Sequence, residues 1–145
     1  MEKALQLAEK AFSLGEIPVG ALIVFQDRVI GEGFNRVELD FDATAHAELI
    51  ALKNASSNIS NPNLKGAILY TTLEPCPMCL GALLLSNISS IVYGASNQKL
   101  GAVDTLIKMR QIPHPGEYPE VIEGVLTERC QELLNNFFTN LRRGG

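Results

Sequence analysis

The sequence predicts an α/β protein with three layers, α/β/α, around a central mixed sheet. Two observations lead to this prediction. A hairpin pattern near the N-terminus indicates an antiparallel pair, and strand, helix and strand patterns then alternate along the chain, as in parallel crossover units. The 145 residues match the size of one ordinary domain, so we expect a single domain over residues 1–145.

The N-terminal quarter predicts a helix followed by a hairpin. Apolar residues recur at helical spacing over residues 4–12, and Gly15 follows as a helix stop. The apolar run 21–25 and the run 28–34 flank the polar pair Gln26-Asp27. Two β-type runs separated by two turn-forming residues are typical of a hairpin.

The next segment predicts a helix, a loop and a strand. Residues 45–54 have helical composition, and Thr44 is a suitable N-cap. Residues 56–65 are rich in Ser, Asn and Pro, which favours a loop. The following run, 67–72, is apolar and β-branched enough to predict a strand.

The remaining elements continue the alternation. Residues 75–85 predict a compact helix, and residues 88–93 predict a strand that ends at Gly94. A short apolar segment, 121–126, predicts the last strand. Residues 127–141 have the periodicity of an amphipathic helix that closes the chain.

Composition excludes several classes of protein. Hydrophobic residues make up 46% of the chain, which supports a packed core and excludes disorder. The net charge of −4 excludes a generally basic nucleic-acid binder, so any RNA contact needs a local patch. Charged residues are only 19%, which indicates surface hidden in an oligomer.

No apolar stretch approaches the length of a membrane span, and the N-terminus lacks the pattern of a signal peptide. We therefore expect a cytoplasmic protein with no membrane partner. In a reducing compartment the Cys76-Pro77-Met78-Cys79 motif indicates metal or redox chemistry rather than a structural disulfide.

The metal hypothesis joins this motif to His46. One imidazole and two thiolates give three zinc ligands and leave a fourth coordination position open, as in catalytic zinc sites. Cys76 and Cys79 are three residues apart, so they share one face of a first helical turn. We expect one zinc ion per chain, held by His46, Cys76 and Cys79.

Glu48 is the candidate for proton transfer. It follows His46 by two residues, about 200° apart on a regular helix, so both reach one site only if His46 lies at the helix end. A carboxylate beside water activated by zinc suits general acid–base catalysis. Glu74, beside Pro75 and Cys76, is expected to position the ligand loop through hydrogen bonds rather than act as a second acid.

Two other readings of the cysteine motif stay open at this point. A redox dithiol leaves His46 and Glu48 unexplained. A structural zinc site needs a fourth protein ligand, and the candidates His114 and Cys130 are distant in sequence.

The motifs of the chain resemble a known family. His-x-Glu followed by Pro-Cys-x-x-Cys is the signature of zinc-dependent nucleobase deaminases. Beyond this signature, most of the chain resembles bacterial tRNA adenosine deaminases of the cytidine deaminase-like superfamily. The residues that carry the resemblance are 15–21 (GEIPVGA), 31–35 (GEGFN), 44–48 (TAHAE), 72–76 (TLEPC), Gly94-Ala95 and 136–138 (NFF).

The resemblance implies a cytidine deaminase-like fold, hydrolysis of adenosine to inosine at the wobble position of a tRNA anticodon, and a homodimer. It implies no organic cofactor beside zinc. It also implies that Asn35 and the backbone amide of Ala47 contact the purine, and that Val19 and Leu73 line the base pocket. In the mechanism that it implies, Glu48 takes a proton from the activated water, delivers it to N1 of adenine and assists loss of ammonia.

Two departures from the family pattern bear on the substrate. Residues 76–82 (CPMCLGA) look as much like guanine deaminases, so a deaminase of guanine or of a cytosine-type base is the alternative enzyme. Ser96-Asn97 stands where the family usually has an Arg-Asp pair at the anticodon loop. Asn97 is therefore a candidate for substrate discrimination, and its alternative role is to cap a turn. A non-catalytic zinc module that binds RNA is the alternative of another class.

Overall fold

A computed structural model describes residues 1–114 and 116–144 of the chain. Among these residues the strands form a five-stranded sheet in the order β2-β1-β3-β4-β5. The strands are Gly20–Phe25 (β1), Arg28–Phe34 (β2), Ile68–Leu73 (β3), Ser90–Ala95 (β4) and Glu120–Ile122 (β5). The helices are Glu2–Ser13 (α1), Ala47–Ile59 (α2), Pro77–Leu85 (α3) and Thr127–Gly144 (α4), with a short 3-10 helix at Met109–Gln111.

The sheet is mixed, as the sequence predicts. β1 pairs antiparallel with both β2 and β3, whereas β3, β4 and β5 run parallel to one another. The two types follow from the connections, because the β1–β2 link is a two-residue turn and the β3–β4 link is the helix α3. Gln26 and Asp27 both have positive φ, 50° and 62°, which is typical of the tight turn of a hairpin.

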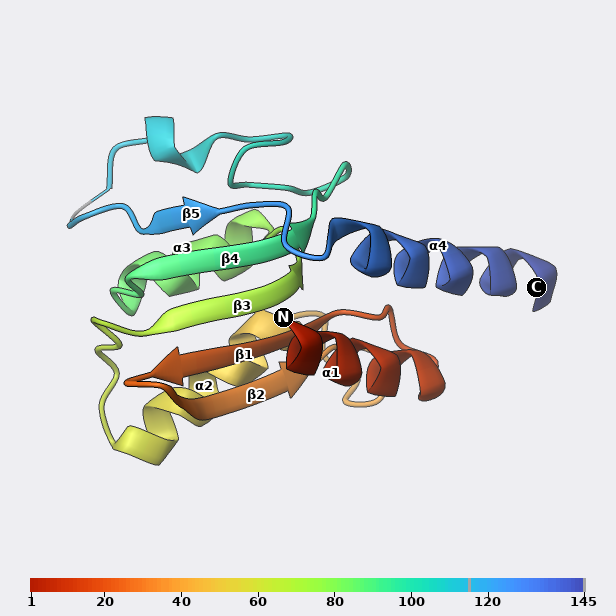
Figure 1. Ribbon diagram of the computed structural model, residues 1–145, viewed down its shortest axis with the longest axis horizontal. Coiled ribbons are helices and arrows are strands. Elements are labelled where there is room, and N and C mark those ends of the chain that lie inside the picture. Colours follow the sequence, from red (N-terminus) through yellow and green to blue (C-terminus); the bar gives the residue numbers. More distant parts are fainter. Residues whose placement is uncertain (115, 145) are drawn as a thin grey trace.

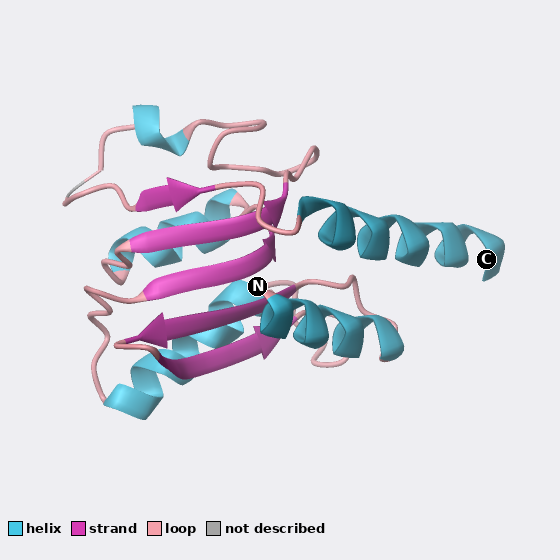
Figure 2. Cartoon of the chain, viewed as in Figure 1, coloured by secondary structure: helices cyan, strands magenta, loops and turns pink. Residues whose placement is uncertain are grey.

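Helices cover both faces of the sheet, which confirms the three-layer prediction. α1 and α4 lie on the face toward the viewer in Figure 1, and α2 and α3 lie behind the sheet (Figures 1 and 2). The main core includes Ile23, Leu69 and Ile91 of the sheet with Leu80 and Leu83 of α3. A second, smaller cluster joins the sheet to α1 and α4 on the opposite face.

Small residues hold α2 very close to β2. A methyl group at Gly33 would lie 2.4 Å from the carbonyl oxygen of Ala47, and one at Gly31 would lie 2.3 Å from that of Ala51. Neither position therefore accepts a side chain unless the helix moves outward. This packing fixes the N-terminal end of α2, where the candidate site residues lie, against the sheet.

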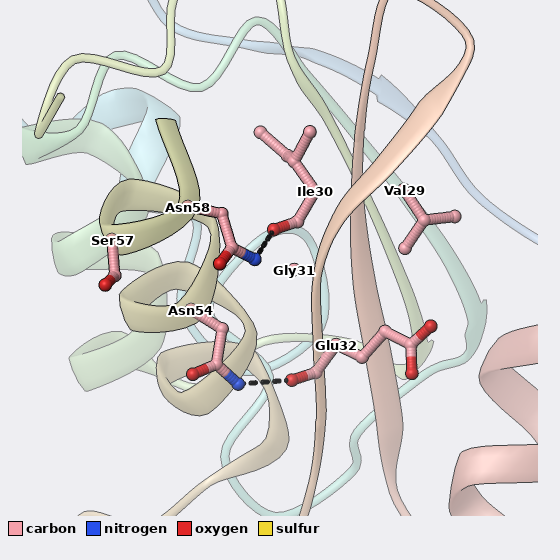
Figure 3. A pocket seen from close by; sticks show the side chains of 7 residues that line it. All are labelled: Val29, Ile30, Gly31, Glu32, Asn54, Ser57 and Asn58. Atoms are coloured by element: carbon pink, nitrogen blue, oxygen red, sulfur yellow. Dashed lines mark hydrogen bonds between the residues drawn. The ribbon is translucent and has the colours of Figure 1, made fainter. Parts of the chain in front are cut away.

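The same close approach explains why α2 continues past residue 54, where the sequence predicts its end. Asn54 and Asn58 reach over the edge strand, and their side-chain amides donate to the carbonyl oxygens of Glu32 (2.8 Å) and Ile30 (2.6 Å) (Figure 3). The helix ends at Ile59, and the C-cap residue Ser60 has a φ of 54°. The segment 56–65, predicted as a loop, is thus helical in its first residues.

Figure 3 also shows an open groove between α2 and the edge of β2. The groove is lined by backbone and by side chains that include Asn54, Ser57 and Asn58, and holds no cysteine or histidine. The asparagine bonds occupy carbonyl groups that an exposed edge strand would otherwise offer to another strand. We therefore assign these contacts to protection of the sheet edge.

Two further predicted boundaries are wrong. Thr44 is not the N-cap of α2, because its amide and hydroxyl both donate to Asp42 Oδ1 and the helix begins only at Ala47. The last strand does not extend over 121–126, because Gly124 and Leu126 have positive φ and end the extended backbone.

No helix in the described part of the chain is long and apolar enough to cross a membrane. The most apolar helix, α3, has nine residues, whereas a span needs about 20.

Candidate active site

Two helix starts bring the predicted metal ligands together. His46 is the N-cap residue of α2 and Cys76 is the N-cap residue of α3, and both have extended backbone at that position. Cys79 lies in the first turn of α3, which Pro77 begins. Unpaired amides at a helix start favour thiolates, so the fold places both sulfurs where negative charge is stabilised.

The distances between the donor atoms fit a tetrahedral zinc site. His46 Nδ1 lies 3.6 Å from the Sγ of Cys76 and 3.6 Å from the Sγ of Cys79. A tetrahedral ion with ordinary zinc–nitrogen and zinc–sulfur bonds holds such atoms about 3.5 Å apart. Within residues 1–114 and 116–144 no other group of three His, Cys, Asp or Glu side chains converges in this way.

The site has three protein ligands, as the sequence predicts for a catalytic metal. Neither Cys130 nor His114 joins the cluster in the described structure. Cys130 is buried in the second core cluster with Leu5 and Leu134. The structural-zinc alternative, which needs a fourth protein ligand, therefore loses its candidates.

The two sulfurs share negative charge unequally. A hydrogen bond from the Cys79 thiol, and then one from His46, lower the pKa of Cys76 to about 4. The same bond to Cys76, together with burial, raises the pKa of Cys79. The pKa of His46 is raised, first by its hydrogen bond with Cys76. A divalent cation beside both sulfurs stabilises the second thiolate as well and favours neutral imidazole.

Glu48 lies at the second position of α2 and only 4% of its surface is exposed. Burial, opposed by its hydrogen bond to its own backbone amide, raises the pKa of Glu48 to about 7. The thiol of Cys79 is within hydrogen-bonding reach of this carboxylate. His46 stands just outside the helix, so the helical angle does not separate it from Glu48, and both groups face one site.

Comparison with known proteins identifies the family of this metal centre. Residues 1–95, which contain all three ligands, match the cytidine and deoxycytidylate deaminase zinc-binding region. The chain belongs to this family. His46, Cys76 and Cys79 are its zinc ligands in this deaminase.

The similarity extends beyond the zinc-binding region. The tRNA-specific adenosine deaminase of Haemophilus influenzae is 48% identical over 143 residues, which cover 98% of this chain and 83% of that protein. A solved structure from a study of A-to-I editing by tRNA:A34 deaminases superposes with a TM-score of 0.89 at 37% identity, covering 92% of this chain and 97% of that one. Guanine deaminase from Nitrosomonas europaea superposes less well, with a TM-score of 0.77 at 25% identity, covering 95% of this chain and 82% of that one.

Three of the predicted base-contact residues are connected beside the zinc ligands of this deaminase. The amide of Asn35 donates to the carbonyl of Val19 at 3.2 Å, and Asn35 Oδ1 accepts from the amide of Ala47 at 2.9 Å. Ala47 directly follows His46. The Ala47 amide is therefore engaged with Asn35, a contact that the sequence does not predict.

The other two predicted contact residues lie at the carboxyl ends of neighbouring parallel strands, Leu73 as the last residue of β3 and Asn97 just after β4. Leu73 ends β3 and is half-buried against the core. Asn97 follows β4, and its Oδ1 accepts from the amides of Lys99 and Leu100 at 3.2 and 3.0 Å. Asn97 therefore caps a turn, and its contact with substrate stays a prediction.

Glu74 is a hydrogen-bond acceptor, as predicted, but its partners are not in the metal-ligand turn. They lie on the segment after β4, where Thr105 donates through both its amide and its hydroxyl. Burial alone raises the pKa of Glu74, but these bonds outweigh it and hold the pKa below its ordinary value. The spacing of the sequence does not predict the contact with Thr105. A glutamate directly after an apolar strand is the one sequence feature that indicates a buried carboxylate in need of hydrogen-bond donors.

Proposed function

We propose that the chain is a zinc-dependent hydrolase that converts adenosine to inosine at the wobble position of a tRNA anticodon. The observation that carries the chemistry is the cluster of His46, Cys76 and Cys79 with the buried carboxyl group of Glu48 beside it. The similarity to tRNA-specific adenosine deaminases over nearly the whole chain supports the substrate. The whole of residues 1–145 acts as one catalytic domain in this proposal.

Bound zinc supplies the Lewis acidity that lowers the pKa of water from about 15.7 to roughly 7. Glu48 carries out the proton transfers. It accepts a proton from the attacking water and delivers it to N1 of adenine. It then takes the second proton from the new hydroxyl group on C6 and gives it to the departing amino group. A C–O bond forms and the C–N bond breaks at C6, and the two protons of water end on N1 and on ammonia. A pKa of about 7 suits a group that must both accept and donate near neutrality.

Asn35, Ala47, Val19 and Leu73 form the base pocket in this proposal. Because Asn35 Oδ1 accepts from the amide of Ala47, the side-chain Nδ2 remains the group that donates to an acceptor of the purine ring. Ala47 then acts by orienting Asn35. The buried apolar side chain of Val19 and the half-buried Leu73 supply apolar contact for the flat base.

Anticodon loops expose unstacked bases that can enter a pocket, which makes them suitable substrates. A tRNA substrate also agrees with a cytoplasmic location. We also propose a homodimer. Few charges and exposed apolar groups such as Leu85, 84% exposed on α3, support it. Sedimentation should give a mass near twice 15.8 kDa, and a monomer mass at micromolar concentration contradicts the dimer.

The experiment that tests the function is incubation of the zinc-loaded protein with a total tRNA pool. Sequencing should then read inosine at adenosine 34 of one or a few tRNAs, and ammonia should be released in step. The same protein is incubated with free guanine and with cytosine. Ammonia from a free base but none from tRNA would replace the proposal with the alternative free-base deaminase.

That alternative has a specific observation in its favour. The chain is structurally similar to guanine deaminase from Nitrosomonas europaea, and Pro77 and Leu80 of the ligand helix also fit the guanine deaminase pattern. The non-catalytic RNA-binding module has less support, because zinc binding alone has no need of the buried Glu48. Ammonia release separates an enzyme from such a module, whereas zinc content does not.

Asn97→Asp is expected to raise the ratio of activity on an RNA anticodon stem-loop to activity on its DNA counterpart by about fivefold. A carboxylate repels phosphates in both substrates, but it also accepts a strong hydrogen bond from a 2′-hydroxyl, which DNA lacks. The turn should persist, because a carboxylate oxygen accepts from the amides of Lys99 and Leu100 as the amide oxygen does.

The matched control is Asn63→Asp. Asn63 Oδ1 also accepts a backbone amide, that of Lys65, in the loop after α2. This substitution adds the same charge in the same kind of turn and should leave the RNA-to-DNA ratio unchanged. An unchanged ratio for Asn97→Asp as well would assign Asn97 a structural role only.

A further inference from the structure

A buried carboxylate after β3 collects its hydrogen bonds from one distant segment. Glu74 is 1% exposed, and its Oε1 accepts from the amide of Asn97 at 3.2 Å. Its Oε2 accepts from the amides of Val103, Asp104 and Thr105 at 3.0, 2.9 and 3.2 Å. The hydroxyl of Thr105 is a further donor. Both ends of the segment 97–105 are therefore tied to one carboxyl group.

The segment also contacts the metal-ligand turn directly. The amide of Ala102 donates to the carbonyl of Pro75 at 2.9 Å, one residue before the zinc ligand Cys76. Gly101 packs against Glu74 so closely that a methyl group there would lie 2.7 Å from the carboxyl carbon. The segment is thus folded around Glu74 and rests on the turn that carries the zinc ligand.

The contacts of Glu74 exclude a role in chemistry. A carboxylate has about four acceptor positions, and four amides and one hydroxyl already occupy them. No lone pair remains for a metal ion or for a proton of the substrate. The role of Glu74 is therefore indirect: it holds the segment 97–105, and the surface of that segment that faces away from Glu74 makes any contact with substrate.

That surface lies at the end of the sheet where the site is built. β3 and β4 are parallel, so the turn with Cys76 and the segment 97–105 leave the sheet at the same end (Figure 1). Ligands of such sheets bind outside the carboxyl ends of the strands. The segment presents the half-buried Asn97 and the exposed Leu100 there.

We propose that Glu74 is a positioning residue that fixes the segment 97–105 against the metal-ligand turn and thereby sets the affinity of the enzyme for its polynucleotide substrate. The segment is the recognition surface, and Glu74 holds it at the correct distance from the zinc. The part that concerns the substrate rests on the proposed function, whereas the part that concerns the segment does not.

Glu74→Gln tests the proposal with a side chain of the same size. One carboxylate oxygen becomes an NH₂ group that faces backbone donors, so some of the hydrogen bonds that Glu74 accepts from the segment are lost. The KM for an anticodon stem-loop should rise about 10- to 100-fold, because buried donors left without an acceptor shift an equilibrium by a factor of this size. The kcat should change less than about threefold, and zinc should stay near one ion per chain.

Gly101→Ala leaves the carboxylate in place and displaces the segment, because the added methyl group would lie 2.7 Å from the Glu74 carboxyl carbon and 2.5 Å from the carbonyl oxygen of Asn97. It should give the same rise in KM. Gly81→Ala is its matched control, because a methyl group at Gly81 meets no atom within 4 Å. This control should retain the KM of the unmodified protein.

Hydrogen exchange supplies a readout that does not depend on the reaction. In Glu74→Gln the amides of Val103, Asp104 and Thr105 should lose protection, while those of β3 and β4 keep it. Unchanged protection would overturn the positioning role, and loss of zinc, or a fall in kcat at constant KM, would overturn the assignment to affinity. If the unmodified protein deaminates no RNA, the proposed function fails, and exchange and zinc content still decide whether Glu74 holds the segment.

Discussion

Glu48→Gln is expected to keep about one zinc ion per chain. Its rate of ammonia release should fall by roughly 10²–10⁴-fold or more. The amide fills the same space in the buried site but neither accepts nor delivers the protons that the reaction moves. Zinc should stay bound because the three ligands are unchanged. Removal of a carboxylate also relieves its repulsion with Cys76, the interaction that helps to raise the pKa of Glu48.

Zinc content and ammonia release are measured on the same sample, so that metal loss and proton-transfer loss are distinguished. Glu32→Gln removes the same charge from a partly exposed ion pair with Lys3, on the opposite face of the sheet from α2, and should keep full activity. Near-normal turnover of Glu48→Gln with zinc bound would show that another group transfers the protons.

The fold was largely predictable because the local sequence pattern, through its periodicity and turn residues, indicates each helix and strand. The hairpin, the parallel strands around α3 and the amphipathic α4 all lie within a few residues of the predicted ranges. The errors came where side chains from elsewhere in the chain decide the boundary. α2 starts late because Thr44 is bonded to Asp42, and it ends late because Asn54 and Asn58 bind the edge strand.

The zinc ligands were predictable for a different reason. Their residue types and spacing are set by coordination chemistry, and the structure only had to bring two helix starts together. The contacts of the substrate side were not predictable in the same way. The bond from the Ala47 amide to Asn35 and the hydrogen bonds that Glu74 accepts join residues 12 and about 30 positions apart, and no periodic pattern encodes such pairs.

Cys76→Ala should lose both zinc and deamination, with zinc content falling from about one ion per chain to near zero after dialysis. The substitution removes the sulfur with the lowered pKa and leaves only His46 and Cys79, two ligands where three hold the ion. Activity should fall below that of Glu48→Gln, because the Lewis acid and the activated water disappear together.

Cys130→Ala is the matched control, since it removes the buried thiol that is not a metal ligand. Cys130 packs with Leu5 and Leu134 between the sheet and α4, outside the metal cluster. It should lower stability by about 1 kcal/mol and keep one zinc ion and full activity. Sustained deamination by Cys76→Ala without metal would end the zinc hypothesis. Loss of zinc from Cys130→Ala would show instead that the packing of α4 supports the site from the opposite face of the sheet.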